Sequence, residues 1–171
     1  MARRPPPVLV WVLLGLRPVT ASADGPGELT LGIEVDRCTP PQGDPALAPA
    51  LAAAIGVDDA WAVVASAFDA EHALDPPQQD APQTLHVTGL ALGAEYSLDV
   101  LDVRPFLDVL VGALVEREGE QSVRAQVEIG VGADWFFLRH VALGVAGRWN
   151  LPLRGGEGYF RVGPRLAVRW P

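Results

Sequence analysis

The sequence predicts an all-β fold: an eight-stranded antiparallel up-and-down transmembrane β-barrel that follows a cleaved N-terminal signal peptide. Three observations lead to this prediction. One long segment, residues 122–135, is apolar at every second position. Turn signals divide the chain after residue 23 into eight strand-length pieces. The links between these pieces alternate between short and long, as they do in barrels that cross the bacterial outer membrane.

The segment 122–135 carries the clearest pattern. Side chains alternate between the two faces of a β-strand, so this segment has one apolar face and one face that is charged, polar or bare. The apolar face consists of Val123, Ala125, Val127, Ile129, Val131, Ala133 and Trp135. The segment has 14 residues, whereas an ordinary strand has about five or six. A long strand with these two faces is typical of a membrane-spanning barrel.

The N-terminus has the three regions of a secretory signal peptide. Two arginines near the start precede the apolar run at residues 8–16, and the small residues 21–23 form the cleavage site. A membrane-spanning helix needs about 20 apolar residues, and this run is too short. We therefore assign residues 1–23 to a signal peptide and residues 24–171 to the barrel.

Composition narrows the function. The chain has a formal net charge of −8, with 21 acidic and 13 basic residues. Nucleic-acid binding needs basic patches, so we expect no nucleic-acid partner. The hydrophobic fraction is 49%, yet no apolar run of helix-spanning length follows the signal segment. Hydrophobicity arranged as alternation is what a transmembrane barrel requires.

The eight predicted strands each show an apolar face. In chain order they are residues 28–36, 46–57, 60–70, 84–98, 103–115, 122–135, 140–151 and 158–170. The apolar faces are formed, in the same order, around Leu29 to Val35, Leu47 to Val57, Trp61 to Phe68, Leu90 to Leu98, Leu107 to Val115, Val123 to Trp135, Val141 to Leu151, and Phe160 to Trp170. Residues 46–57 are rich in alanine and are also compatible with a helix. We predict a strand there, because the hairpins pair up only when this strand is present.

The links predict an orientation. The links at residues 58–59, 99–102 and 138–139 are short, and those at 37–45, 71–83, 116–121 and 152–157 are longer or more polar. Short turns of outer-membrane barrels lie on the periplasmic side. Both chain ends are then expected on that side.

The inward faces predict a filled lumen. Eight strands enclose a space that side chains can just fill, and the inward positions carry small residues and charges of both signs. Charges removed from water must be paired, so we predict an internal salt-bridge network and no wide pore. Its predicted members are Glu28, Glu34, Glu95, Arg104, Asp108, Arg124, Glu128, Asp134, Arg148, Arg161, Arg165 and Arg169.

Large aromatic residues gather near one end of the strands. Indole and phenol rings prefer the interface between membrane and water. We interpret them as the periplasmic half of an aromatic girdle, with the members Trp61, Tyr96, Trp135 and Trp170.

The sequence offers little for metal or cofactor chemistry. Cys38 is the only cysteine and is predicted to lie in a proline-rich loop. His72 is predicted in an outer loop and His140 beside a periplasmic turn, so a shared metal site is not expected. We expect no metal and no cofactor.

A catalytic site is not expected either. Ser66 and His86 lie in the outer halves of neighbouring predicted strands, and only Asp69 or Glu71 could orient them. A triad needs nucleophile, base and orienting acid within hydrogen-bond reach. We therefore assign no catalytic residues and predict that the chain is not an enzyme.

The signal ending at residues 21–23, the eight alternating strands and the terminal strand 159–170 resemble the small outer-membrane barrels of the OmpA-transmembrane-domain, OmpX and OmpW type. The resemblance covers residues 24–171. It implies location in the outer membrane, contact with outer-membrane lipid and the barrel-assembly machinery, and a monomer. Members of this group serve in anchoring, passive transport, adhesion and stress resistance. The group usually ends in an aromatic residue, whereas here Pro171 follows Trp170.

Three functions follow in order of preference. The first is an integral outer-membrane barrel with a structural or narrow-pore transport role. The second is a secreted soluble barrel that binds a small apolar ligand, as lipocalins do, with its apolar face inward. The third is a lipid hydrolase of the outer leaflet that uses Ser66 and His86.

Overall fold

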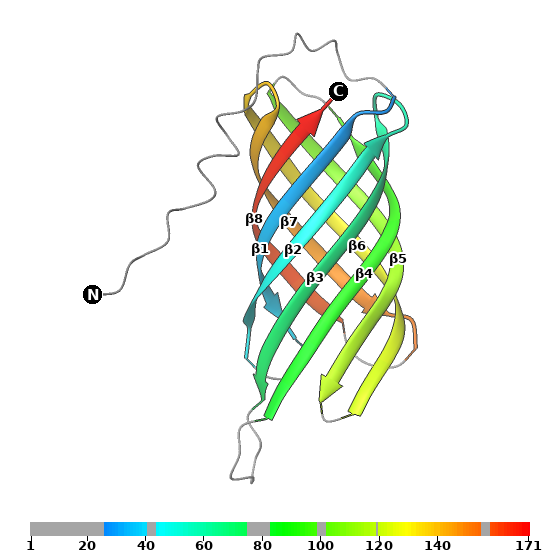
Figure 1. The fold of residues 1–171 in the computed structure, drawn as a ribbon, viewed down its shortest axis with the longest axis vertical. Coiled ribbons are helices and arrows are strands. Elements are labelled where there is room, and N and C mark those ends of the chain that lie inside the picture. The colour runs from blue at the N-terminus through cyan, green and yellow to red at the C-terminus, as the bar shows by residue number, and fades with distance from the viewer. Residues whose placement is uncertain (1–25, 41–43, 75–82, 99–101, 119, 155–157) are drawn as a thin grey trace, which may run out of the picture.

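A computed structural model describes residues 26–40, 44–74, 83–98, 102–118, 120–154 and 158–171. The predicted signal peptide lies outside these residues. The described residues form a closed antiparallel barrel of eight strands, each paired with the next in the chain and the last with the first (Figure 1). The predicted all-β barrel is confirmed. The strands are β1 (Leu29–Thr39), β2 (Ala46–Gly56), β3 (Trp61–Leu74), β4 (Gln83–Ser97), β5 (Val103–Glu118), β6 (Glu120–Leu138), β7 (Val141–Pro152) and β8 (Tyr159–Trp170).

Pairing of β1 with β8 closes the barrel. Leu29 lies opposite Trp170, and Glu34 lies opposite Arg165. The start of β1 and the end of β8 therefore lie at the same end, which is the upper end in Figure 1. We name this the terminal end and the opposite end the far end. Among the described residues, no helix is long and apolar enough to cross a membrane.

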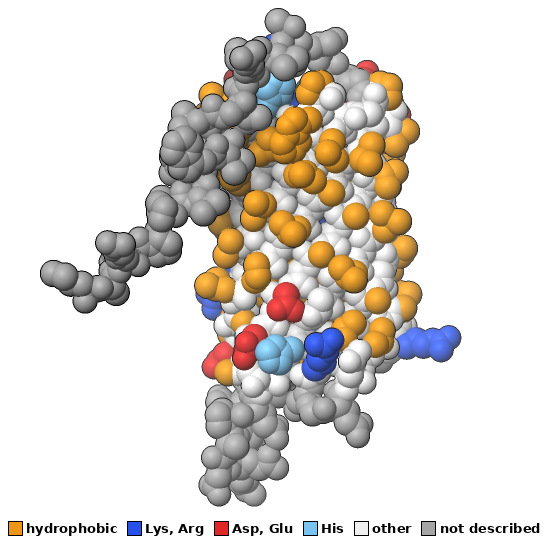
Figure 2. Space-filling view, in the orientation of Figure 1, with side chains coloured by type: hydrophobic (Ala, Val, Ile, Leu, Met, Phe, Trp, Pro, Cys, Tyr) orange, Lys and Arg blue, Asp and Glu red, His pale blue; other side chains and the backbone are white. Residues whose placement is uncertain are grey.

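The two faces of each strand have opposite surroundings. On β1, Leu31, Ile33 and Val35 are exposed, whereas Glu34 and Asp36 are almost completely buried. Figure 2 shows hydrophobic side chains spread over the barrel wall, with charged side chains gathered towards the far end of the face in view. The apolar face predicted from alternation is thus the outer face, and the charged face lines the lumen.

Glycines on the lumen face lie beneath large inward side chains of the adjacent strand. The ring of Phe68 lies over its cross-strand partner Gly89, and the carboxylate of Asp108 lies over Gly130. A Cβ atom at either glycine would overlap the side chain above it. The lumen glycines therefore make the room in which the large interior side chains lie.

The alanine-rich segment forms β2, as predicted. It pairs with β1 from Cys38↔Ala46 to Leu29↔Ile55. Its alternate alanines, among them Ala48 and Ala52, are buried in the lumen. Ladder pairing on both sides of this segment outweighs the helix preference of alanine, which is only a few tenths of a kcal/mol per residue.

The prediction that residues 116–121 form one of the longer or more polar links is wrong. β5 and β6 continue their pairing as far as Glu118↔Glu120, so a single residue, 119, separates the two strands. The charged stretch keeps the two-residue alternation, with Glu116 buried and Arg117 exposed. Polar residues can continue strand pairing just as apolar residues do within the barrel wall, because the paired strands are joined by backbone hydrogen bonds.

Cys38 and His72 also lie in strands, not in the loops predicted for them. Cys38 is in β1 and His72 in β3, and both are fully buried. Each continues the inward series of its strand, Cys38 after Asp36 and His72 after Ala70. The prolines that follow Thr39 end β1 only after this cysteine.

The strands differ in length, and the difference is concentrated at one end. β3, β4, β5 and β6 have 14, 15, 16 and 19 residues, whereas β1, β2, β7 and β8 have 11 or 12. The four long strands extend beyond their neighbours at the far end (Figure 1). We call this four-stranded extension the far-end sheet.

Candidate functional site

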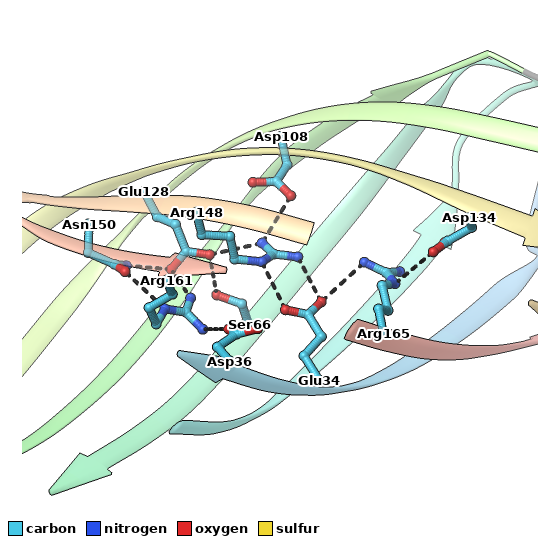
Figure 3. Close-up of polar contacts among 10 residues, drawn as sticks. All are labelled: Glu34, Asp36, Ser66, Asp108, Glu128, Asp134, Arg148, Asn150, Arg161 and Arg165. Carbon is cyan, nitrogen blue, oxygen red and sulfur yellow. Dashed lines mark hydrogen bonds and ion pairs between the residues drawn. The ribbon is translucent and has the colours of Figure 1, made fainter. Parts of the chain in front are cut away.

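The candidate site is the lumen, and Arg148 of β7 is its centre. The Arg148 guanidinium is 2.9 Å from Asp108 Oδ2 and 2.9 Å from Glu128 Oε1 through Nη1, and 3.2 Å from Glu34 Oε1 through Nη2. Its Nε also donates to Glu34 Oε2 at 3.3 Å. One cation thus joins carboxylates from β1, β5 and β6 across the barrel (Figure 3).

Arg161 of β8 forms a second set of contacts on the far-end side of Arg148. Its Nη1 is 2.9 Å from Asp36 Oδ2, its Nη2 is 3.2 Å from Glu128 Oε2, and its Nε donates to Asn150 Oδ1 at 3.0 Å. Asn150 Nδ2 and Ser66 Oγ donate to the two oxygens of Glu128 at 2.7 and 3.0 Å. Glu128 is therefore shared by both arginines (Figure 3).

Arg165 extends this network towards the terminal end. Its Nη1 is 3.3 Å from Glu34 Oε1, and its Nε is 3.4 Å from Asp134 Oδ1. The central network then contains five carboxylates and three guanidinium groups, all nearly inaccessible to solvent. Its members are Glu34, Asp36, Asp108, Glu128, Asp134, Arg148, Arg161 and Arg165.

Phenylalanine rings support the three arginines of β8. Arg161 lies 4.0 Å above the ring of Phe68, and Arg165 lies 4.8 Å from the ring centre of Phe106. Arg169 lies 4.1 Å from the ring centre of Phe136. A cation over an aromatic face is attracted by the ring quadrupole. The rings also exclude water from one side of each guanidinium.

Further ion pairs lie near the two mouths of the lumen. At the terminal end, Arg104 is 3.9 Å from Glu28 and 3.8 Å from Glu95. At the far end, Glu116 accepts from Tyr159 Oη at 2.7 Å and pairs with Arg124 at 2.8 Å. Between the far-end pair and the central network lies an apolar cluster of buried residues. Its members are Cys38, Ala48, Ala50, Phe68, Ala70, Val87, Leu114 and Tyr159.

The structure therefore places all twelve charged residues named from the sequence on the lumen side, and it joins them in more than one group. Arg169 pairs with Glu28, so the terminal-end group contains Glu28, Glu95, Arg104 and Arg169. Arg124 pairs with Glu116 and belongs to the far-end group.

Sequence reasoning missed several members of the lumen. Asp36 and Glu116 hold positions in phase with predicted inward residues, so the alternation contained their signal. The stacked phenylalanines had a weaker signal. The prediction that Phe68 belongs to the apolar outer face is wrong: Phe68 is buried in the lumen beneath Arg161. Phe68 and Phe106 both depart from the pattern of an apolar outside and a polar inside, and the glycine opposite each ring makes room for it.

The four aromatic residues named from the sequence lie on the outer wall near the terminal end. Trp61 and Tyr96 are cross-strand partners with ring centres 5.1 Å apart. Trp135 and Trp170 are half exposed or nearly so. At the other end of the wall, Trp149 and Phe160 form a second exposed cross-strand pair.

The structure does not bring Ser66 and His86 together. Ser66 points into the lumen and donates to Glu128. His86 lies on the outer wall, where its Nε2 is 3.8 Å from Glu71. The two side chains are on opposite faces of the wall, so nucleophile and base cannot meet. His72 is buried near Tyr159 at the far end, away from His140, which precedes β7 at the terminal end.

The comparisons with known proteins identify the fold. No family model matches the sequence, and no curated protein is similar to it in sequence. Among solved structures, Neisserial surface protein A is similar with a TM-score of 0.64 and 12% identity, over 84% of this chain and 96% of that one. OprG from Pseudomonas aeruginosa has a TM-score of 0.62 and 10% identity, over 85% and 97%.

The N-terminal β-barrel domain of Pseudomonas aeruginosa OprF is also similar, with a TM-score of 0.59 and 13% identity, over 86% of this chain and 100% of that domain. At these identities the likeness shows the fold alone. The chain has the fold of the small eight-stranded outer-membrane barrels, as its resemblance to that group implies.

Proposed function

We propose that this protein is an integral outer-membrane barrel with a structural role, whose lumen is closed by its own side chains. The observation that carries the proposal is the central network around Arg148. It links β1, β5, β6, β7 and β8 across the lumen at a level where eight strands leave no spare width. Buried ion pairs that cross the lumen and an apolar cluster beside them support a barrel that does not conduct hydrated ions.

The outer wall supports the location in a membrane. A bilayer requires strands of about 9–11 tilted residues and a closed sheet without edges inside the lipid. The strands are at least that long, the sheet is closed, and the wall carries exposed leucine, isoleucine and valine. An apolar-ligand carrier would need the reverse arrangement, with its apolar face inside.

The partners follow from this location. We propose export through the signal peptide at residues 1–23, insertion by the barrel-assembly machinery, and a monomer in contact with outer-membrane lipid. The terminal end then faces the periplasm and the far end faces the outside. The four aromatics near the terminal end would serve as the periplasmic half of an aromatic girdle.

Two measurements test the proposal. In cell fractionation, the protein should be recovered with the outer membrane and should migrate differently on a gel with and without boiling. Soluble periplasmic recovery without detergent would overturn the location. In planar bilayers, the purified barrel should show no steady ionic current under conditions in which a general porin, used as a positive control, conducts. A steady current would contradict the closed lumen and would favour the narrow-pore transport role instead.

A further inference from the structure

The charges inside the lumen do not balance, and the excess lies in the central network. Five carboxylates and three guanidinium groups meet there, which leaves two more negative than positive charges. The terminal-end group contains two acids and two arginines, and the far-end pair contains one of each. Buried charges are very unfavourable unless they are paired. Each neighbouring group is already balanced, so the excess must be neutralised within the central network.

Hydrogen-bond donors are shared unequally among these carboxylates. Glu128 accepts from four side chains, and Glu34 accepts three hydrogen bonds from two arginines. Asp108 accepts one, from Arg148 Nη1 to Oδ2 at 2.9 Å. Its second oxygen, Oδ1, is buried and has no hydrogen-bond partner among the described residues.

The other two aspartates of the network have better-placed cations. In the described part of the chain, Asp36 is the one carboxylate that contacts Arg161 Nη1, at 2.9 Å. Asp134 lies directly opposite Arg104 in the strand pairing. Opposite charges that face each other across a strand pair are favourable. Asp108 has neither advantage.

The groups that face Asp108 are mostly acidic. From β4, Glu95 lies directly opposite it, and both side chains are buried. From β6, Glu128 contacts the same nitrogen of Arg148 at the same distance of 2.9 Å. From β1, Glu34 contacts the other side of that guanidinium. Three carboxylates thus surround Asp108, and the arginine that contacts it is shared with two of them.

The strand neighbours of Asp108 offer no donor to its second oxygen. On β6 the partner is Gly130, which has no side chain, and the Asp108 carboxylate lies directly over this glycine. On β4 the partner is Glu95, whose carboxylate is an acceptor. The described residues include no group of three or more His, Cys, Asp or Glu side chains placed to hold a metal ion. A proton is therefore the ligand that fits Oδ1, because it removes the charge and needs no further space.

We propose that Asp108 binds a proton in the folded barrel under conditions in which an exposed aspartate is ionised. The proton is carried on Oδ1, and Oδ2 of the neutral carboxyl group still accepts from Arg148. An exposed aspartate loses its proton above about pH 4, so above this pH folding takes up a proton at Asp108. Asp108 therefore makes the barrel more stable in weak acid than at higher pH. The inference goes beyond the proposed function and does not depend on where the barrel is located.

Unfolding at several pH values tests the bound proton. Asp108→Asn keeps the shape of the neutral carboxyl group but cannot ionise. The folded original chain holds one more proton than the unfolded chain. Each pH unit between about 4.5 and 6 should therefore raise its unfolding equilibrium constant about tenfold relative to that of Asp108→Asn. Urea unfolding in phospholipid vesicles, followed by the gel shift of the folded barrel, measures both constants.

Asp69 offers a matched control. It is exposed on the outer wall and accepts from Thr88 Oγ1 at 2.6 Å. Asp69→Asn removes an aspartate that is ionised over this range, so its unfolding constant relative to that of the original chain should change less than about threefold. An equally constant ratio for Asp108→Asn would overturn the proposal.

Infrared spectroscopy detects the proton without a variant. The folded original barrel at about pH 6 should show the C=O stretch of a carboxylic acid, because exposed carboxyl groups are ionised there. Isotope labelling of the aspartate carboxyl carbons should shift this band, and folded Asp108→Asn should lack it. Absence of the labelled band from the original chain would overturn the proposal, whether or not the variant folds.

Two further outcomes would assign the excess charge differently. An acid band that persists in folded Asp108→Asn would place the proton on another carboxyl group and overturn the assignment to Asp108. An unfolding-constant ratio that does not depend on pH, but changes when choline replaces sodium at equal ionic strength, would replace the proton by a bound cation. Failure of either measurement would leave the outer-membrane location standing, since both report on the lumen alone.

Discussion

Replacement of Arg148 by methionine should destabilise the barrel more than any other single loss of charge in the lumen. The substitution keeps an unbranched side chain but removes the cation that Glu34, Asp108 and Glu128 share. These three carboxylates are at most 1% exposed, so water cannot replace the lost partner.

The expected magnitude follows from this burial. Removal of one partner of a buried ion pair lowers stability by about 3–5 kcal/mol, a large share of the about 5–15 kcal/mol that a folded domain has in total. Arg148→Lys should fall between the original chain and Arg148→Met, because an ammonium keeps the charge but cannot form the paired contacts that Nε and Nη2 make with Glu34.

Arg124 offers a matched control. It also bridges a carboxylate, Glu116, at 2.8 Å, but its side chain is 34% exposed at the far end. Solvent screens such a pair, so Arg124→Met should lower stability by less than about 1 kcal/mol. Urea unfolding of the refolded variants in phospholipid vesicles, followed by the gel shift of the folded barrel, measures both free energies. Equal midpoints for Arg148→Met and Arg124→Met would refute the view that buried pairing holds the lumen together.

Three further predictions use the same unfolding assay or a labelling assay. Asp108→Asn should lower stability by less than about 1.5 kcal/mol, because the central network has more carboxylates than cations and an amide still accepts a hydrogen bond; a loss as large as that of the central arginine would contradict this. Gly89→Ala should lower stability by about 1–3 kcal/mol through overlap with the phenylalanine ring above it. Gly147→Ala, with its nearest neighbouring atom at 3.8 Å, should have a much smaller effect, and similar losses at both glycines would show that overlap is not the cause. Cys38 should resist maleimide in the folded barrel and react after unfolding, whereas rapid labelling of the folded protein would place it outside the lumen.

Alternation was the strongest signal in the sequence because it reports a local property of the strand. Leu31, Ile33 and Val35 had to share one face whatever lay around them, and a closed sheet leaves only two surroundings for a face. Asp36 and Cys38 also follow this alternation in β1, although the sequence analysis named neither of them as a lumen residue. The prolines after Thr39 suggested that the strand ends earlier than it does. A turn signal marks where strand pairing can stop, but it does not show how far the partner strand continues to pair.

The composition and length of the links predicted the strand ends less well than alternation predicted the strand faces. The charged stretch around Glu116 and Arg117 looks like a loop by composition, yet β6 pairs with it residue by residue. Whether a polar stretch forms a strand depends on the neighbour that accepts its backbone hydrogen bonds. That neighbour is known only when the register is known.

The sequence by itself determined the number of strands, most of the residues that each strand turns outward and most of the charges that the lumen must hold, because these follow from turn signals and from the period of two along the chain. Only the tertiary structure decided which charges meet. Arg148 and Glu34 are 114 positions apart in the chain and are brought to 3.2 Å by the closure and stagger of the barrel. The same stagger pairs Arg124 with Glu116 at the far end, because register is a property of strand pairs and no single strand contains it.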